Sequence, residues 1–146
     1  MHERFMQRAI EIARENPTAP FGALLVDVKT EEIVAEGINR GGENPIWHGE
    51  IDCISSCSEA HPEADWGQLR MYTTAEPCCM CQGAILWAGI REVVYGTSIH
   101  TLQRLGWRQI AIGADEVARR TPFAECKLIG GVLEHECDEL FRAALG

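Results

Sequence analysis

One histidine and two cysteines, far apart along the chain but each in a tight local pattern, constrain the fold more than any other feature. His48-Gly49-Glu50 comes first, and Pro77-Cys78-Cys79-Met80-Cys81 follows after a long interval. Imidazole and thiolate groups bind zinc, and catalytic zinc sites take three protein ligands and keep the fourth position for water. A fold that uses His48, Cys78 and Cys81 as one ligand set must bring these two segments together.

The spacing of the cysteines favours an open metal site. The chain has seven cysteines, an odd number that suits metal ligands and buried thiols better than a disulfide framework. In the first turn of a helix, Cys78 and Cys81 face the same way, and the helix N-terminus favours thiolate. Pro77 suits that turn, because a backbone N–H at this position would have no hydrogen-bond partner within the helix. No second Cys-x-x-Cys or His-x-x-x-His supplies a fourth ligand. The remaining cysteines are expected to be small buried side chains: Cys53, Cys57, Cys126 and Cys137.

Glu50 is the candidate catalytic residue. It lies two residues beyond His48 and is not needed as a ligand. Zinc lowers the pKa of a bound water towards about 7, so that a nearby carboxylate can take its proton and pass it on. We therefore expect Glu50 to act as a proton shuttle at the open position.

Hydrophobic periodicity and turn residues predict helices that alternate with strands after an opening hairpin. We expect helices over Met1–Glu15, His48–Ala60, Cys78–Ala88 and Glu134–Leu145, with two short helical pieces within Leu102–Arg120. We expect strands over Phe21–Val28, Glu32–Ile38, Leu69–Thr74, Glu92–Tyr95 and Lys127–Leu133. The second helix is expected to place Ile51, Ile54 and Ser55 on one side. This order predicts a single α/β domain over residues 1–146, with a mixed sheet covered by helices on both faces.

These motifs resemble the zinc-dependent cytidine/deoxycytidylate deaminase superfamily, whose signature is H-x-E…P-C-x-x-C. The resemblance extends over nearly the whole chain, through Phe21–Val26, Gly37–Asn39, Gly83–Gly96 and Gly131–Phe141. It implies a three-layer α/β/α fold with a mixed five-stranded sheet. It also implies that His48, Cys78 and Cys81 bind Zn²⁺ and that Glu50 is catalytic. The backbone N–H of Cys78 is then expected to donate a hydrogen bond to the oxygen of the tetrahedral intermediate.

Three side chains are candidate substrate contacts. Asn39 matches the family's base-contacting asparagine, and the alternative is a loop asparagine that satisfies its own turn. Trp47 either walls the pocket or packs at the junction of loop and helix. Trp107 either stacks on a flat base or packs in the core. Arg104 and Arg108 are better explained as part of a solvated helical face, together with Arg119 and Arg120.

The sequence leaves three classes of substrate open. The chain resembles bacterial guanine deaminases at Pro20-Phe21-Gly22-Ala23 and at Trp87. It resembles fungal cytosine deaminase at His48-Gly49-Glu50, because the middle position of this motif is more commonly alanine in the guanine and tRNA deaminases. The ending Gly131–Phe141 resembles tRNA adenosine deaminases. We expect deamination of a free nucleobase or related aminated heterocycle, guanine first. An inactive zinc-stabilised scaffold is the alternative outside the enzymes, and the presence of Glu50 argues against it.

Net charge bears on the partner. Thirteen Lys and Arg residues against 22 Asp and Glu residues give a net charge of −9. That balance argues against nucleic acid as the obligatory ligand without excluding it, because polyanion binding leaves a basic footprint. The charged start is not a secretory signal, and no uncharged apolar run reaches the roughly 18–20 residues of a membrane span. We expect a cytoplasmic protein that binds a small molecule, with a homodimer implied by the resemblance.

Overall fold

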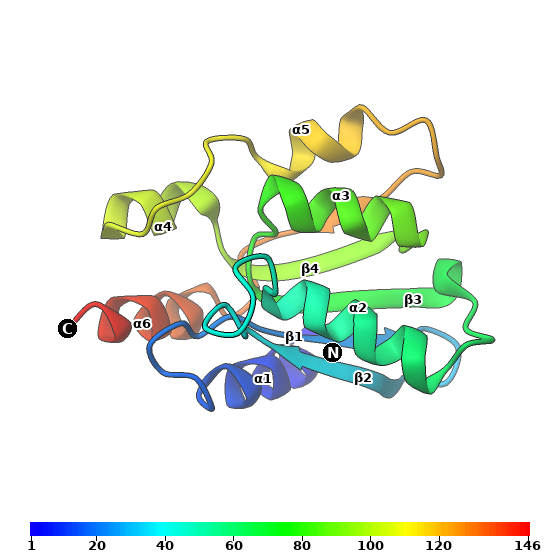
Figure 1. Ribbon diagram of the computed structural model, residues 1–146, viewed down its shortest axis with the longest axis horizontal. Coiled ribbons are helices and arrows are strands. Elements are labelled where there is room, and N and C mark those ends of the chain that lie inside the picture. The colour runs from blue at the N-terminus through cyan, green and yellow to red at the C-terminus, as the bar shows by residue number, and fades with distance from the viewer.

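The computed structural model describes residues 1–146 and is organised around a five-stranded sheet in the order β2-β1-β3-β4-β5 (Figure 1). The strand β1 is antiparallel to both β2 and β3, whereas β3, β4 and β5 run parallel. The mixed five-stranded sheet is therefore confirmed. The strands are β1 (Gly22–Asp27), β2 (Glu32–Ile38), β3 (Leu69–Ala75), β4 (Glu92–Thr97) and β5 (Lys127–Ile129).

Helices cover both faces of the sheet, which confirms the three layers. The helices α1 (His2–Ala13) and α6 (Glu134–Ala144) pack on one face. On the other face lie α2 (Gly49–Ala60), α3 (Cys79–Ala88) and α5 (Ala114–Arg119), and Figure 1 shows α2 and α3 side by side. The remaining elements are α4 (Ile99–Leu105) and the short 3₁₀ turn Trp66–Gln68. None of the helices is long and apolar enough to span a membrane.

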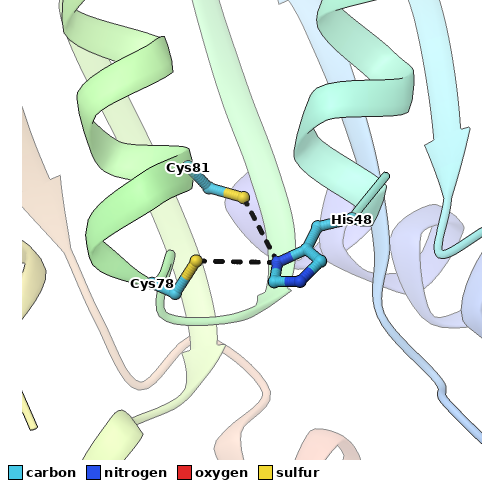
Figure 2. Close-up of side chains that lie close together, drawn as sticks. All are labelled: His48, Cys78 and Cys81. Atoms are coloured by element: carbon cyan, nitrogen blue, oxygen red, sulfur yellow. Dashed lines mark hydrogen bonds between the residues drawn. The ribbon is translucent and has the colours of Figure 1, made fainter. Parts of the chain in front are cut away.

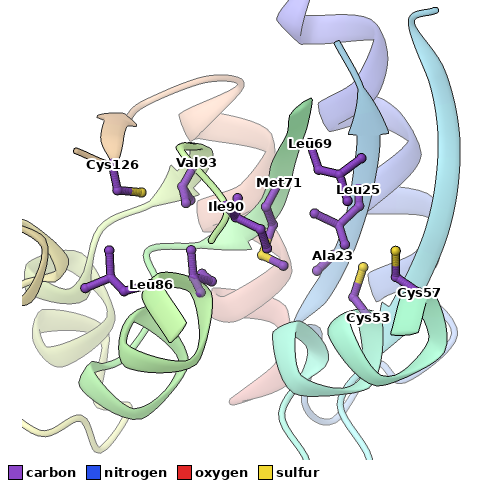
Figure 3. Packing of buried hydrophobic residues seen from close by; sticks show 11 residues of the cluster. Ala23, Leu25, Cys53, Cys57, Leu69, Met71, Leu86, Ile90, Val93 and Cys126 are labelled. Atoms are coloured by element: carbon purple, nitrogen blue, oxygen red, sulfur yellow. The ribbon is translucent and has the colours of Figure 1, made fainter. Parts of the chain in front are cut away.

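The first strand shows how the sequence builds this core. Side chains alternate between the faces of a strand, and a strand covered on both faces is apolar throughout. Ala23 and Leu25 pack towards α2 and α3, together with Met71 and the thiols of Cys53 and Cys57 (Figure 3). The neighbouring residues Leu24 and Val26 pack against α1 instead. Cys126 and Cys137 are also buried, so all four cysteines outside the metal motif are buried as predicted.

The residues predicted to share one side of α2 are Ile51, Ile54 and Ser55, and all three are half-buried. The buried residues of the helix are Gly49, Glu50, Asp52, Cys53 and Cys57. The first turn directs polar groups inward: Asp52 accepts the backbone N–H of Ile38 at 3.0 Å, and Glu50 enters the site described below.

Two boundaries also differ. The last strand ends at Ile129, short of the predicted Leu133, because the backbone turns there: φ is +77° at Gly131 and +51° at Leu133. Pro77 does not occupy the first helical turn. It precedes Cys78, which is the N-cap of α3, and its missing N–H is equally harmless outside the helix.

Candidate active site

Two helix starts hold the three predicted ligands. His48 is the N-cap of α2, Cys78 is the N-cap of α3, and Cys81 lies in the first turn of α3. Both sulfur atoms point towards the imidazole ring (Figure 2). The His48 Nδ1 atom lies 3.5 Å from the Sγ of Cys78 and 3.6 Å from the Sγ of Cys81. The fold therefore brings the two distant motifs into contact, as the sequence predicts.

The donor atoms fit a zinc ion. A tetrahedral zinc with bonds of about 2.3 Å to sulfur and about 2.0–2.1 Å to nitrogen separates those two donors by about 3.5 Å. The observed separations of 3.5 and 3.6 Å match this spacing. All three donor atoms lie within 4.8 Å of one another. Two thiolates and one imidazole are the soft and borderline donors that zinc prefers, so the geometry and the chemistry agree.

The ligand set carries a thiolate before any metal binds. A hydrogen bond from the Cys81 thiol, followed by one from His48, lowers the pKa of Cys78 to about 4. The same hydrogen bond raises the pKa of Cys81, because its proton is held between the two sulfur atoms. Hydrogen bonding to Cys78 raises the pKa of His48. Since metal binding requires deprotonated ligands, Cys78 is the ligand already in the binding form at neutral pH.

Glu50 lies beside this ligand set with a perturbed carboxyl group. Only 4% of the residue is exposed. Burial, reinforced by the negative charge on Cys78, raises the pKa of Glu50 to about 7. A carboxyl group that titrates near neutral pH can both accept and release a proton, which is what a shuttle requires.

A small pocket opens onto these residues. Its volume is about 230 Å³, which is below the roughly 300–1,000 Å³ of sites for drug-sized ligands, so it suits a single heterocycle. A larger groove of about 760 Å³ lies between α3 and α5, away from the ligand set. The small pocket is the candidate active site because His48, Cys78 and Glu50 line it. Its lining residues are Ala19, Phe21, Asn39, His48, Glu50, Glu76, Cys78, Trp107, Arg108 and Gln109.

Asn39 lines the pocket and also makes its own turn. Its side-chain oxygen accepts the backbone N–H of Gly41 at 2.8 Å, while its backbone N–H donates to the carbonyl of Phe21 at 3.1 Å. Asn16 donates to the Asn39 carbonyl at 3.0 Å. The turn therefore uses the amide oxygen, and no protein group accepts a hydrogen bond from the side-chain NH₂. Asn39 is thus a turn residue that also lines the pocket, and its contact with a substrate stays a prediction.

The two tryptophans differ. Trp47 is not among the lining residues: its indole N–H donates to Asp52 at 2.9 Å, which is the packing role at the junction of loop and helix. Trp107 lines the pocket. Its indole N–H donates to the carbonyl of Phe141 at 3.0 Å, and its ring meets Phe21 edge-on at a centroid distance of 5.4 Å. Trp107 is therefore a fixed aromatic wall.

Sequence reasoning missed part of the lining. Arg108 does not belong to a helical face: it follows α4 in a loop and lies at the pocket with Gln109. Glu76 also lines the pocket. The only sequence signal for these residues was their position next to predicted site residues: Arg108 and Gln109 follow Trp107, and Glu76 precedes Pro77.

The fold and the ligand set define a zinc-binding α/β/α protein. The family model of the cytidine and deoxycytidylate deaminase zinc-binding region matches residues 1–97. This match covers more than half of the chain, and the protein belongs to that family.

Curated relatives carry three different activities. A guanine deaminase of Bacillus subtilis is 37% identical over 106 residues, 68% of this chain and 66% of the relative. A probable cytosine deaminase of Schizosaccharomyces pombe is 30% identical over 104 residues, 69% of this chain and 63% of the relative. A tRNA-specific adenosine deaminase of Haemophilus influenzae is 30% identical over 142 residues, 94% of this chain and 79% of the relative. The chain thus spans under two-thirds of the length of the first two.

Solved structures share the fold. A guanine deaminase from Nitrosomonas europaea superposes with a TM-score of 0.82 at 22% identity, covering 97% of this chain and 83% of that one. A structure from a study of tRNA:A34 deaminases gives 0.78 at 27% identity, covering 94% of this chain and 98% of that one. The cytidine-deaminase-like fold is confirmed, and the relatives leave the substrate open.

Proposed function

We propose that the protein is a hydrolytic deaminase that removes an exocyclic amino group, as ammonia, from a free nucleobase or related aminated heterocycle, with guanine as the first candidate. The observation that carries the proposal is the placement of a buried Glu50 in the same small pocket as His48 and Cys78. A merely structural zinc site has no use for a buried carboxyl group beside it, since burying an ionisable group is unfavourable.

Zinc, when bound, supplies a water molecule acidified to near neutral pH. The chain's own groups perform the proton transfers. Glu50 accepts one proton of the attacking water and delivers it to the ring nitrogen, then accepts the remaining hydroxyl proton of the tetrahedral carbon and delivers it to the departing amine. Water and an aminated ring carbon thereby become a carbonyl group and ammonia, with no oxidant or reductant. In this proposal the backbone N–H of Cys78 donates a hydrogen bond to the oxygen on the tetrahedral carbon.

The pocket favours a free base as substrate. Its volume of about 230 Å³ suits a flat heterocycle, with Trp107 as an aromatic wall and the Asn39 amide as a donor at the rim. The net charge of −9 disfavours a large polyanion. The N. europaea guanine deaminase shares the fold, and the B. subtilis guanine deaminase shares 37% identity.

A tRNA adenosine deaminase is the second candidate. The H. influenzae relative named for this activity matches 94% of the chain, more than the guanine deaminase does. Arg108 is exposed beside the pocket, where a cation would meet a phosphate of a flipped nucleotide. The net charge of the chain thus favours a free base, whereas the coverage of its relatives favours a tRNA substrate. Measured turnover of both substrates decides between them.

We further propose a cytoplasmic homodimer. The groove between α3 and α5 exposes 79% of Trp87 and 45% of Phe123, whose rings meet at 4.9 Å. The charged residues that line the groove, Glu116 and Arg120, pair with each other, so no net charge of the lining opposes a second copy. A second copy of this chain is therefore the proposed occupant of the groove.

Ammonia release from a substrate panel tests the activity. Zinc-loaded protein is assayed with guanine, cytosine, adenine, their nucleosides, aminated triazines and an adenosine-containing anticodon stem-loop. We expect turnover of free bases, guanine fastest. Turnover of the stem-loop alone would replace the free-base assignment with RNA deamination.

Glu50→Gln separates enzyme from scaffold. It keeps the shape of the side chain and removes its acidity, so we expect wild-type zinc content with a rate lower by at least about 10²–10⁴-fold. Unchanged turnover would show that Glu50 is not the shuttle.

A further inference from the structure

One carboxylate beside the metal motif ties together two helices that are distant from it in the sequence. Glu76 directly follows β3, and its backbone N–H donates to the Thr97 carbonyl at 2.7 Å. Its side-chain Oε1 accepts the N–H of Ile99 at 2.9 Å, and Oε2 accepts the N–H of Ala114 at 2.8 Å. Ile99 and Ala114 are the first residues of α4 and α5. Each oxygen of the carboxylate therefore holds one helix start.

The physical chemistry of helix ends explains why this contact matters. The first N–H groups of a helix have no partner within it, and a negative charge is favoured there. Hydrogen bonds to a carboxylate are stronger than those between neutral groups. Ser98 already caps α4 by accepting the N–H of Thr101 at 3.0 Å, whereas no side chain in the N-cap position serves α5. Both helices are too short to be stable without tertiary contacts.

The segment between the two helix starts forms one wall of the active site. Trp107, Arg108 and Gln109 lie between α4 and α5, and all three line the pocket. Glu76 lines it as well, two residues before the ligand Cys78. The same carboxylate thus fixes the wall on both sides, near its beginning and its end, relative to the metal ligands.

We propose that Glu76 is a positioning residue that sets substrate affinity by holding the Trp107–Gln109 wall against the metal centre. The kinetic part of this inference rests on the proposed deaminase function. A wall contacts the substrate in the ground state and the transition state alike, and loss of such uniform binding raises KM while leaving kcat nearly unchanged. Glu76 therefore acts through the wall and takes no part in proton transfer.

Two substitutions test the carboxylate. Glu76→Gln keeps the shape but has one acceptor oxygen, so one of the two helix starts loses its partner. Glu76→Asp keeps the charge but shortens the reach. For whichever base the wild type converts, we expect KM to rise about tenfold in Glu76→Gln, the scale of one lost charge-assisted hydrogen bond. We expect a smaller rise in Glu76→Asp, and kcat and zinc content within about twofold of wild type in both.

Two control variants separate positioning from general destabilisation. Ser98→Ala weakens the start of α4 by removing its cap and leaves the Glu76 carboxylate in place. Glu92→Gln removes a half-buried carboxylate that pairs with Arg70 at the opposite end of the sheet. Neither control should reproduce the KM effect of Glu76→Gln.

Hydrogen exchange gives a readout that needs no substrate. In Glu76→Gln, at least one of the amides of Ile99 and Ala114 should lose protection while those of β3 and β4 keep it. Unchanged protection, an equal KM rise in Ser98→Ala, or a fall in kcat without a KM change would each overturn the proposal. If the wild type converts no substrate in the panel, the proposed function fails, and exchange at Ile99 and Ala114 still decides the role of Glu76.

Discussion

The glycine between His48 and Glu50 has no room for a side chain, and Gly49→Ala tests this constraint on the candidate active site. A Cβ atom at Gly49 would lie 2.5 Å from the carbonyl oxygen of Phe21, where ordinary contacts begin at 3.4 Å. The same Phe21 oxygen accepts the N–H of Asn39 at 3.1 Å. One added methyl group therefore pushes the start of α2 away from Phe21 and disturbs Asn39, which lines the pocket.

The magnitude follows from the size of the clash. The start of α2 or the Phe21 peptide must move by about 0.9 Å, the difference between 3.4 and 2.5 Å. Overpacking of this kind costs about 1–3 kcal/mol, of which the helix preference of alanine returns up to about 1 kcal/mol. With that full return, the net loss is up to about 2 kcal/mol, which lowers Tm by up to about 8 °C in a domain of this size. A misplacement approaching 1 Å at Glu50 costs up to about 10²-fold in kcat/KM.

The assay compares zinc-loaded wild type and Gly49→Ala by thermal unfolding and by ammonia release. Gly83→Ala is the matched control, because a Cβ atom at Gly83 meets nothing within 4 Å and alanine favours a helix interior. The control should be neutral or slightly stabilising. If Gly49→Ala equals wild type in both Tm and kcat/KM, the close approach of α2 to Phe21 is not a constraint and the reasoning is wrong.

Three further predictions concern the metal, the acid limb of stability and the dimer. Removing zinc with a chelator should abolish activity and lower Tm together, because the ion binds the folded state; activity that survives a verified metal strip would refute this. A hydrogen bond from Arg8 lowers the pKa of Glu36 in the folded protein. The stabilisation by this pair is therefore complete above about 4.3, the pKa of a glutamate in the unfolded chain, and is lost as pH falls through the lower pKa of Glu36 in the folded protein. Denaturant unfolding should therefore show Glu36→Gln less stable than wild type by at most about 1 kcal/mol at pH 7, with the gap closing in acid; a pH-independent gap would contradict the assignment. Trp87→Asp should shift sedimentation towards the monomer while Ile46→Asp, also at an exposed apolar residue, does not; an unchanged dimer would remove the groove from the interface.

Local patterns predicted most of the fold. The first helix is recognisable because Phe5, Ala9 and Ile12 recur at helical spacing, and the structure buries all three. The strand Glu32–Ile38 has the predicted bounds. The end of β5 was missed because the backbone leaves the sheet at a positive φ, which hydrophobicity does not reveal. The burial of Glu50 and Asp52 in α2 was not predicted, because hydrophobic periodicity does not indicate buried carboxylates.

The candidate site, like the fold, was predicted where the sequence pattern is local and missed where it depends on distant contacts. Each ligand motif is local in the sequence, so spacing together with the family resemblance predicted His48, Cys78 and Cys81, which the fold brings into contact. The pocket walls arise from contacts between segments far apart in the chain. Periodicity could not place Arg108 at the pocket, turn Trp47 towards Asp52 or direct the Glu76 carboxylate to Ala114.

The placement of the ligands at two helix starts and of the pocket wall in a loop separates the metal site from one wall of the pocket. The ligands are held by α2 and α3, both of which pack on the core of the sheet. Trp107, Arg108 and Gln109 belong instead to an irregular connection, in which Trp107 packs against the smaller cluster around Phe141. Under the proposed deaminase function, substitutions in this one short stretch of chain would change which amine the pocket accepts, while the residues on α2 and α3 stay as they are.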